Sequence, residues 1–496
     1  MLTTLAAPAF ADIWHIENGD ITISAGESGN NVTQNNNTTY GDTNTIITNQ
    51  NKDTASSHTV TIEAKDKDDK VEVTLKDVNI DTSSRNKAAV SVTGEGDTNI
   101  KLDGDNALKS DIYRSGIYGS GSGSLTISGG ENDSLTAQGG SGANGISSSG
   151  SLTISGGTVT ANGDDGGRGI SSSGSVTISG GSTVTANGGS GTISGGDGIC
   201  SSGGVTISGG STVTANGGNG GSLVGGDGIR SDGGVTISGG TVKAAGGDSK
   251  DGYGGDGIRS GGGVTISGNT VNAAGGNGGK VGGYGICSFD RVAISGGTVE
   301  AAGGNGSTGG GSGIYSSVID LSGSLELTAK AGSPNGKALS QKGSELVLDT
   351  IKDKLGPGAK VTATDADGKV IDQVSTPRPV EPEESSSSSD GGSAAPSAPA
   401  SPLPGLTVTD KDGQRISYTS TQSGNTLTVC VGRLTASFRI SLAALRQLRA
   451  EGIETIAFQT VLCSTTLSVD ELLAMGGENA EAVLTHRFTD SSLTVG

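Results

Sequence analysis

Apolar and hydroxyl residues alternate along a motif that recurs between about Gly116 and Gly332. The motif reads Val/Leu-Thr-Ile-Ser-Gly, then Thr-Val-x-Ala, then a glycine-rich stretch that ends in Gly-Ile. A period of two predicts β-strands with one buried face, because successive side chains of a strand point to opposite sides. The isoleucine of the first segment recurs at intervals of 24 to 30 residues, at Ile127, Ile154, Ile178, Ile207, Ile237, Ile266 and Ile294, with Leu321 as an eighth.

A repeat of this length predicts stacked units, none of which can bury its apolar face alone. In one unit, Val205 and Ile207 point inward, Val213 and Ala215 do the same in the next segment, and Ile229 marks a third. Three short strands per turn predict an all-β fold, a right-handed parallel β-helix. We expect its glycines to form the corners with positive φ. A flexible glycine-rich linker is the competing interpretation, but such linkers carry no register-locked Val and Ile.

The flanking sequence predicts irregular ends for this solenoid. Residues 12–115 keep the strand alternation without a regular repeat, which indicates wider coils that begin the helix and cover its end. Regular repeats fill residues 116–332. Residues 333–374 predict terminal coils that close with a hairpin, in which Asp367-Gly368 is the turn.

Two segments of different character follow. Residues 375–404 are rich in Pro, Ser and Glu, a composition that predicts an extended linker. Residues 405–496 predict a small α+β domain, in which Ser441 caps one helix and Ser468 with Glu471 opens another. This domain contains no recognisable active-site motif.

The first residues of the chain predict secretion, and its net charge argues against binding of nucleic acids. Segment 1–11 is apolar and ends in Ala9-Phe10-Ala11, which indicates the remnant of a signal peptide and a secreted protein, with display at the cell surface as a further expectation. The 496-residue chain has a formal net charge of −19. This charge argues against a nucleic acid partner, because phosphate binding needs clustered Lys and Arg. No stretch is long and apolar enough to span a bilayer.

Four cysteines do not form a disulfide framework in this sequence. Cys200 and Cys287 both follow Gly-Ile, and three strand layers separate them, which places their Cα atoms about 14 Å apart. That distance is beyond the reach of a disulfide, so we expect free thiols. The pairing of Cys430 with Cys463, in the predicted C-terminal domain, is left open.

Three segments near the N-terminus and the repeat itself resemble a known family. The segments are Glu17–Ile23 (ENGDITI), Val73–Asp81 (VTLKDVNID) and Ile100–Ser110 (IKLDGDNALKS). With the repeated Ile-Ser-Gly-Gly-Thr-Val-x-Ala, they resemble the secreted β-helix "carbohydrate-binding domain" proteins of Gram-positive bacteria, over about residues 12–331. The resemblance implies a parallel β-helix, and some members of the wider group bind acidic plant polysaccharides with calcium. This chain replaces the usual Gly-Ala-Gly-Ile-Gly-Gly turn with Gly-Asp-Gly-Ile-Arg-Ser or Gly-Asp-Gly-Ile-Cys-Ser.

Stacking converts columns of the sequence into ladders on the surface, and two such columns carry candidate binding residues. The column two positions before each Gly-Ile isoleucine contains Arg168, Asp197, Asp227, Asp256 and Tyr284. The column one position after it contains Cys200, Arg230, Arg259 and Cys287. Pairing of Asp with Arg along the helix is the simplest role for these columns.

A ligand site is the alternative. Arg230 and Arg259 are candidates to hold uronate carboxylates, because the guanidinium fork fits them. Tyr253 and Tyr284 lie near the same turns and are candidates to stack on a sugar ring. The candidate ligands for Ca²⁺, an ion that takes several oxygen ligands, are Asp197, Asp227 and Asp256.

Further polar columns predict a structural role. One contains Asp165, Ser190, Asn219, Asp248, Asn277 and Asn305, and another contains Asn162, Asn187 and Asn216. We expect these side chains to satisfy backbone groups of the turns.

These observations favour non-catalytic binding of an extracellular polysaccharide or cell-surface glycan, an acidic polysaccharide being one candidate. A passive surface stalk or adhesin scaffold is the alternative, and a polysaccharide lyase or hydrolase is the third candidate. Stacking alone would bring Asp227 and Asp256 to the separation that glycoside hydrolysis needs. No sequence feature is expected to raise either pKa or to supply the floor of a cleft. We therefore assign no catalytic residue, and Ca²⁺ is the one cofactor considered.

Overall fold

A computed structural model describes residues 12–377 and, in the C-terminal part, residues 406–410, 414–416, 418–423, 425–431, 435–460, 464–475, 480–487 and 490–495. The chain divides into two units, Met1–Glu383 and Glu384–Gly496. The predicted signal-peptide remnant lies outside the described residues, as does nearly all of the predicted linker.

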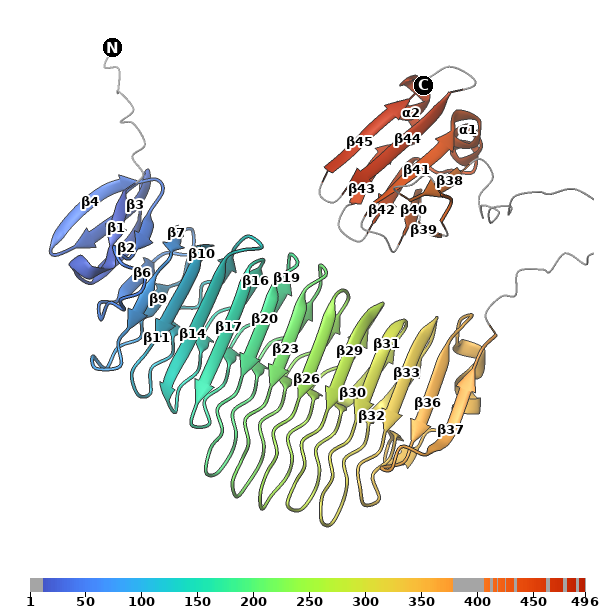
Figure 1. Ribbon diagram of the computed structural model, residues 1–496, viewed down its shortest axis with the longest axis horizontal. Helices are drawn as coiled ribbons and strands as arrows, with labels where there is room; N and C mark the ends of the chain where they lie inside the picture. The colour runs from blue at the N-terminus through green and yellow to red at the C-terminus, as the bar shows by residue number, and fades with distance from the viewer. Residues whose placement is uncertain are drawn as a thin grey trace, which may run out of the picture. The chain divides into compact units, whose positions relative to one another are not determined.

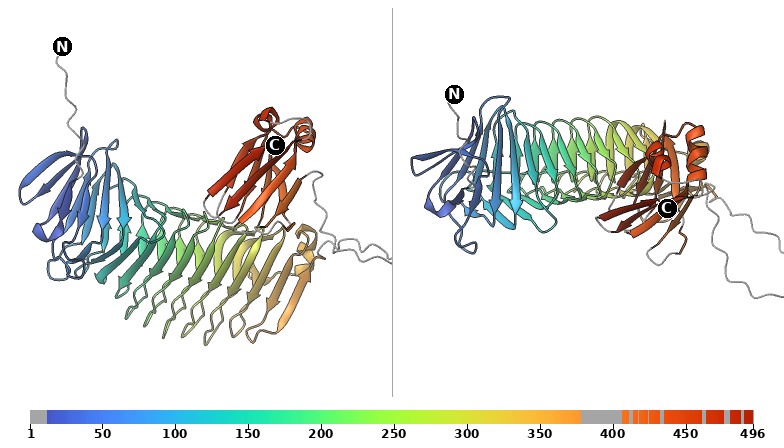
Figure 2. Two further views of the ribbon diagram at one scale, coloured as in Figure 1. Left: turned by 45° about the horizontal axis from the view of Figure 1, so that its top comes forward. Right: turned by 90° about the horizontal axis from the view of Figure 1, so that it is seen from above.

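The first unit is a parallel β-solenoid of about 13 turns. Its turns stack along one axis, as Figures 1 and 2 show. A regular turn contributes three strands, for example β21 (Ile199–Ser201), β22 (Val205–Ile207) and β23 (Thr212–Asn216), and each pairs in parallel with its equivalent on the next turn. The predicted solenoid, with three short strands per turn, is therefore confirmed.

The first ladder consists of the strands that begin at Gly-Ile and their equivalents on the irregular turns at both ends. Before β21 it contains β2 (Ile21–Gly26), β6 (Val60–Ala64), β9 (Val90–Gly94), β12 (Ile117–Gly119), β15 (Ile146–Ser148) and β18 (Ile170–Ser172). After β21 it continues through β24 (Ile229–Ser231), β27 (Ile258–Ser260), β30 (Ile286–Ile294), β32 (Ile314–Leu321) and β34 (Leu339–Gln341).

The second ladder shares one sheet with the first, because β30 and β32 run through both. Its other strands are β1 (Ile13–His15), β5 (Ile46–Thr48), β7 (Lys70–Lys76), β10 (Asp97–Asp103), β13 (Leu125–Ser128), β16 (Leu152–Ser155), β19 (Val176–Ser179), β22, β25 (Val235–Ile237) and β28 (Val264–Ile266). The third ladder is a separate sheet of β8 (Asn79–Asp81), β11 (Asp105–Lys109), β14 (Ser134–Ser141), β17 (Thr158–Asp164), β20 (Thr183–Asn187), β23, β26 (Thr241–Ala245), β29 (Asn269–Ala274), β31 (Gly297–Ala302), β33 (Leu325–Lys330), β36 (Lys360–Thr364) and β37 (Val370–Ser375).

The core of the solenoid consists of stacked identical side chains. Ile199, Ile229 and Ile258 are Cα partners on successive turns, and each is completely buried. Full burial of one such side chain contributes roughly 1.5–3 kcal/mol. Inward serines join the core without loss of hydrogen bonding, because each hydroxyl donates to a carbonyl of the preceding turn, as Ser231 Oγ does to Gly203 at 2.7 Å.

Both ends of the solenoid are covered by antiparallel strands. At the N-terminal end, β2 pairs with β3 (Gly29–Gln34), which pairs with β4 (Asn37–Asp42). Trp14 packs against this end of the core, and its Nε1 donates to Asp42 at 3.0 Å. At the other end, β36 and β37 form the predicted hairpin, whose turn includes Gly368 at φ 84°. The 3₁₀-helices η1 (Ile16–Asn18) and η2 (Leu348–Lys354) and the short strand β35 (Ser344–Glu345) complete the two ends. The outermost strands of the β2–β3–β4 and β36–β37 pairings are therefore β4 and β37, which run antiparallel to their neighbours.

Five long loops between the third and first ladders stack into a flat projection, which we call the loop blade. It comprises loops 188–198, 217–228, 246–257, 275–285 and 303–313, and it projects below the cyan to yellow strands in Figure 1. A continuous zigzag of backbone hydrogen bonds crosses it. Gly218 N–H donates to Gly196, Gly226 N–H to Gly218, and Gly247 N–H to Gly226, all at 2.8–2.9 Å.

Most glycines of the loop blade are required by close packing of the backbone. This corrects our expectation that the glycines of the repeat form corners with positive φ. Positive φ does occur at the corner between β22 and β23, where Gly209 and Gly210 have φ of 63° and 73°. Gly226, by contrast, is not in the left-handed region, and a Cβ there would lie 1.9 Å from the carbonyl oxygen of Gly196. Neighbouring loops therefore approach each other more closely than any side chain permits.

The described residues of the second unit form two four-stranded sheets and two short helices. One sheet has the order β38 (Leu406–Thr409), β41 (Thr435–Ser441), β44 (Glu481–Arg487), β45 (Asp490–Val495), and the other β39 (Thr419–Ser423), β40 (Thr426–Cys430), β42 (Thr455–Gln459), β43 (Ser464–Ser468). Helix α1 (Leu442–Ala450) begins after Ser441, whose hydroxyl accepts the Ala444 N–H at 3.2 Å. Helix α2 (Val469–Met475) follows Ser468, whose hydroxyl accepts the Glu471 N–H. Among the described residues, no helix has the length and apolar character needed to cross a membrane.

Candidate functional site

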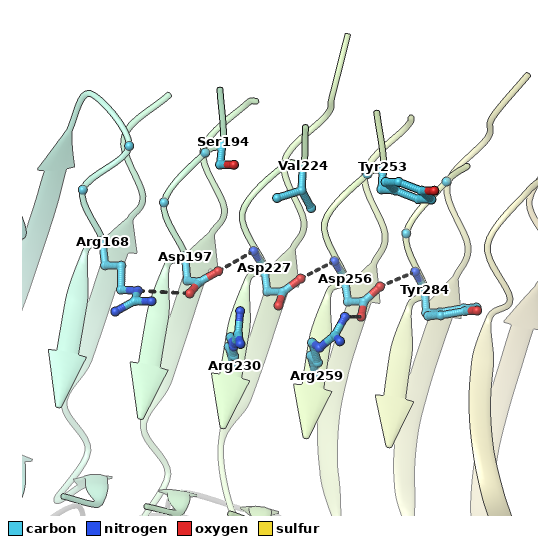
Figure 3. A pocket seen from close by; sticks show the side chains of 18 of the residues that line it. Arg168, Ser194, Asp197, Val224, Asp227, Arg230, Tyr253, Asp256, Arg259 and Tyr284 are labelled. Carbon is cyan, nitrogen blue, oxygen red and sulfur yellow. Dashed lines mark hydrogen bonds and ion pairs between the residues drawn. The ribbon is translucent and has the colours of Figure 1, made fainter. Parts of the chain in front are cut away.

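All seven residues predicted as candidate ligand contacts line one groove. Its volume is about 780 Å³, and it runs along the axis of the solenoid where the loop blade meets the first ladder. Figure 3 shows two rows of side chains that face each other across it. The structure therefore brings together Arg230, Arg259, Tyr253, Tyr284, Asp197, Asp227 and Asp256.

The charged wall of the groove is built by a column of side chains that accept backbone hydrogen bonds from the next turn. Asp197 Oδ1 accepts the Asp227 N–H at 2.9 Å, and Asp227 Oδ1 accepts the Asp256 N–H at 2.7 Å. Asp256 Oδ1 in turn accepts the Tyr284 N–H at 2.7 Å. Asn144 does the same for the Arg168 N–H at 2.8 Å, so an amide serves as well as a carboxylate at this position.

Arginine side chains occupy the same wall, and they differ in their pairing. Arg168 Nε lies 3.2 Å from Asp197, and Arg259 Nη1 lies 3.3 Å from Asp256. Of these two contacts, the one between Arg259 and Asp256 joins the two predicted columns, whereas Arg168 and Asp197 belong to the same column. Arg230 is exposed and forms no ion pair with any residue that the structure describes. It is therefore the guanidinium of this wall that is available to an anionic ligand.

Two carboxyl groups of this wall have raised pKa values, contrary to our expectation. Burial raises the pKa of Asp227 well above its ordinary value of 3.8, and the neighbouring Asp256 and Asp197 add to the effect. Burial also raises the pKa of Asp256 to about 6, against the opposing influence of the Tyr284 N–H and the Arg259 guanidinium. Stacking places these carboxyl groups among the backbones of neighbouring turns, where they keep little contact with water.

The opposite wall comes from the returning arms of the loop blade. Ser194, Val224, Tyr253 and Val281 are bridge partners on successive turns. Tyr253 is 51% exposed and projects from this row. Between the two walls lie glycines, including Gly195, Gly225, Gly254 and Gly282. They supply the floor that the sequence was not expected to provide.

One end of the groove carries a cluster of aromatic rings. The ring of Tyr284 stacks on that of Tyr315 with a centroid separation of 4.9 Å. The guanidinium of Arg259 lies 5.4 Å from the ring centroid of Phe289. Tyr284 is thereby held flat at the end of the groove, with one face covered by Tyr315.

The predicted calcium ligands lie in a single column, one carboxylate per turn. One oxygen of each of Asp197, Asp227 and Asp256 is already engaged by a backbone N–H. Within the part of the chain that the structure describes, no three His, Cys, Asp or Glu side chains gather in a group suited to a metal ion. Calcium binding stays a prediction.

Both remaining polar columns are structural, but only one satisfies turn backbone groups as expected, because the asparagines of the other bond one another along β17, β20 and β23. Asn216 Nδ2 donates to Asn187 and Asn187 Nδ2 to Asn162, each at 2.8 Å. Asn219 Oδ1 accepts the Asp248 N–H at 2.9 Å, and Asp248 Oδ1 accepts the Asn277 N–H at 2.6 Å. These ladders fix the register of neighbouring loops and do not line the groove.

Sequence reasoning missed the loop blade and the apolar wall that it forms. The signal was present in the sequence, because a Gly-Gly pair joins each residue of this wall to the member of the charged column that follows it. The four wall residues are Ser194, Val224, Tyr253 and Val281. Comparison with family models, with curated proteins and with solved structures finds no significant match to this chain.

Proposed function

We propose that the groove binds an extended polysaccharide chain without cleaving it. The observation that carries the proposal is the arrangement of Tyr253, Arg230 and Arg259 on consecutive turns around one glycine-floored groove. Tyrosine offers an apolar face for a sugar ring, and guanidinium and carboxyl groups offer hydrogen bonds to hydroxyl groups. Glycines let the ligand approach the backbone closely.

The periodicity of the groove supports a polymeric ligand. Equivalent backbone positions recur once per turn, at the spacing of paired strands, about 4.8 Å. This spacing is close to the length of one hexose unit along an extended polysaccharide. Successive units of such a polymer would therefore meet successive turns of the groove.

The charge of the groove supports an acidic ligand. Three arginines and three aspartates line the groove, and Arg230 forms no ion pair with any described residue. Burial raises the pKa of Asp227, so this carboxyl takes up a proton more readily than an exposed one. A sugar carboxylate would give the guanidinium of Arg230 a partner.

The proposal also includes secretion of the protein and its similarity to the family suggested by the N-terminal motifs. We infer that the chain acts outside the cell and that it is similar to the β-helix carbohydrate-binding domain proteins of Gram-positive bacteria. We also infer that the solenoid is right-handed, the hand that parallel strand connections almost always take. The second unit is then a small α+β domain attached to the binding solenoid through the predicted linker.

Binding of the full-length protein to a panel of neutral and uronic-acid polysaccharides tests this function, first with calcium and then with chelator. Arg230→Ala should weaken retention on the acidic members, and Arg230→Lys should restore it only in part because the fork is lost. Tyr253→Ala should weaken retention on every polysaccharide that binds. Lys243→Ala is the matched control, because it removes a positive charge from the exposed face of β26 outside the groove. Unchanged retention of the groove variants would favour the passive scaffold.

The raised pKa values of Asp227 and Asp256 favour hydrolysis as a second candidate. A neutral carboxyl beside an ionised one can serve as a general acid in glycoside cleavage. Release of reducing ends from a polysaccharide that binds, and its loss in Asp256→Asn, would establish this activity. Binding without release of reducing or unsaturated ends would leave the non-catalytic function in place.

A further inference from the structure

A second pocket adjoins the groove at the end away from the aromatic cluster. Its volume is about 250 Å³, and its lining includes Tyr113, Arg114 and Tyr118. It shares Gly142 and Asn144 with the lining of the groove. The two hollows therefore meet at these residues.

Tyr113 is held at the rim of this pocket in an unfavourable backbone conformation. Its φ is 59°, in the left-handed region that bulky residues rarely adopt, and its side chain is 77% exposed. The ring lies over Gly142, where a Cβ would be 2.8 Å from Tyr113 Cε1. Core packing does not require an exposed ring, so a tyrosine at this strained position is a candidate contact for a ligand.

Tyr118 stands in the same column as the arginines of the groove. The Cα partners along this column run from Tyr118 through Ser147, Ser171 and Cys200 to Arg230. The serines and the cysteine are small, and the guanidinium of Arg168 lies over this stretch, 3.5 Å from the Ser171 hydroxyl. Tyr118 is 44% exposed and belongs to the lining of the second pocket.

We propose that the second pocket is an outer subsite for the same polysaccharide chain, with the rings of Tyr113 and Tyr118 as its sugar contacts. This inference rests on the proposed polysaccharide-binding function. Six strand pairings separate the turn of Tyr118 from that of Tyr284, or about 29 Å. The ligand is then a linear chain of at least about six sugar units, with aromatic contacts at both ends and charged contacts in the middle.

Size-graded oligosaccharides, prepared from a polysaccharide that the full-length protein retains, test the outer subsite by calorimetry. Affinity should rise until the main groove is filled and then rise again as the chain reaches Tyr118. Tyr118→Ala should abolish the second rise, a loss of about tenfold for the longest chains, and leave the affinity for the shortest unchanged. Tyr113→Gly should act in the same direction and cannot fail through backbone strain, because glycine accepts the left-handed conformation.

Tyr40→Ala provides the matched control, because Tyr40 is also 77% exposed and lines neither pocket. If the second rise persists in both tyrosine variants, or if the wild-type protein binds short and long chains equally, the outer subsite is wrong while polysaccharide binding stands. If no polysaccharide or oligosaccharide binds at all, both the subsite and the proposed function fail.

Discussion

The carboxylate of Asp227 accepts the backbone N–H of Asp256 at 2.7 Å, so two acidic side chains stand on consecutive turns of one buried column. Both have raised pKa values, and that of Asp256 is about 6. The folded protein therefore keeps protons that the unfolded chain releases near the ordinary value of 3.8. This difference links folding to pH at the centre of the groove.

Stability should fall as the pH rises from about 4 to about 6. In this interval the folded state binds more protons than the unfolded state, so the free energy of unfolding decreases with pH, by about 3 kcal/mol for Asp256. Thermal unfolding of the full-length protein across this range measures the effect. Asp256→Asn should flatten the profile without loss of the backbone contact, because Asn144 makes the equivalent contact in the same column. A wild-type profile that rises with pH over this range would contradict the buried protonated state.

Retention of an acidic polysaccharide should strengthen as the pH falls from about 7 to about 5. Asp256, with a pKa of about 6, takes up a proton over this interval while sugar carboxylates stay ionised, so the groove gains positive charge relative to its ligand. Binding isotherms at several pH values test this dependence. A neutral polysaccharide is the control, and the double variant Asp227→Asn, Asp256→Asn should bind the acidic one with little change across the range. Weaker retention at the lower pH would refute the assignment.

Substitution of Gly226 by alanine should destabilise the loop blade by about 1–3 kcal/mol or more. The added Cβ would meet the Gly196 carbonyl oxygen at 1.9 Å, and the zigzag of hydrogen bonds leaves no room to move. Gly309→Ala is the matched control in the same blade, because its nearest neighbour would be 3.9 Å away. Denaturant unfolding distinguishes the two variants. Equal stability would mean that neighbouring loops are not packed as closely as described.

Cys200 and Cys287 should resist alkylation in the folded protein. Burial raises the pKa of Cys200 to about 11 and that of Cys287 further still, so neither thiol is ionised near neutral pH. Alkylation followed by peptide mass mapping should show slow labelling of both sites in buffer and complete labelling in denaturant. Rapid labelling of Cys287 in the native state would show that its turn opens.

The fold was predictable because the same apolar residues recur at the same place in every turn. Ile199, Ile229 and Ile258 are spaced in the sequence as they are stacked in the structure. The same alignment brought Arg230, Arg259 and the Asp column together in one groove. Columns read from a repeat become ladders in space, so candidate residues far apart in the chain were placed side by side without a structure.

The raised pKa values and the role of the glycines could not be predicted in the same way. They depend on how far the loops of each turn extend from the solenoid axis, and the repeat pattern does not give that distance. The loop blade encloses one side of the Asp column, and this enclosure is what raises the pKa of Asp227 and Asp256. Tyr118 was overlooked because its column was followed only from Cys200 onward. The glycines were assigned to corners, although many of them, such as Gly226, are required by contacts between neighbouring backbones.

Each turn contributes residues to both walls of the groove, so the length of the groove is proportional to the number of repeats. Duplication of one coding repeat would add a further Asp, a further basic position and a further loop to the blade, and move the C-terminal end outward by one strand spacing. Little new packing is needed, because the inward faces of neighbouring turns are nearly identical. Recombination between similar repeats could therefore adjust the length of ligand that the groove accommodates in single steps, where most binding sites would need several coordinated substitutions.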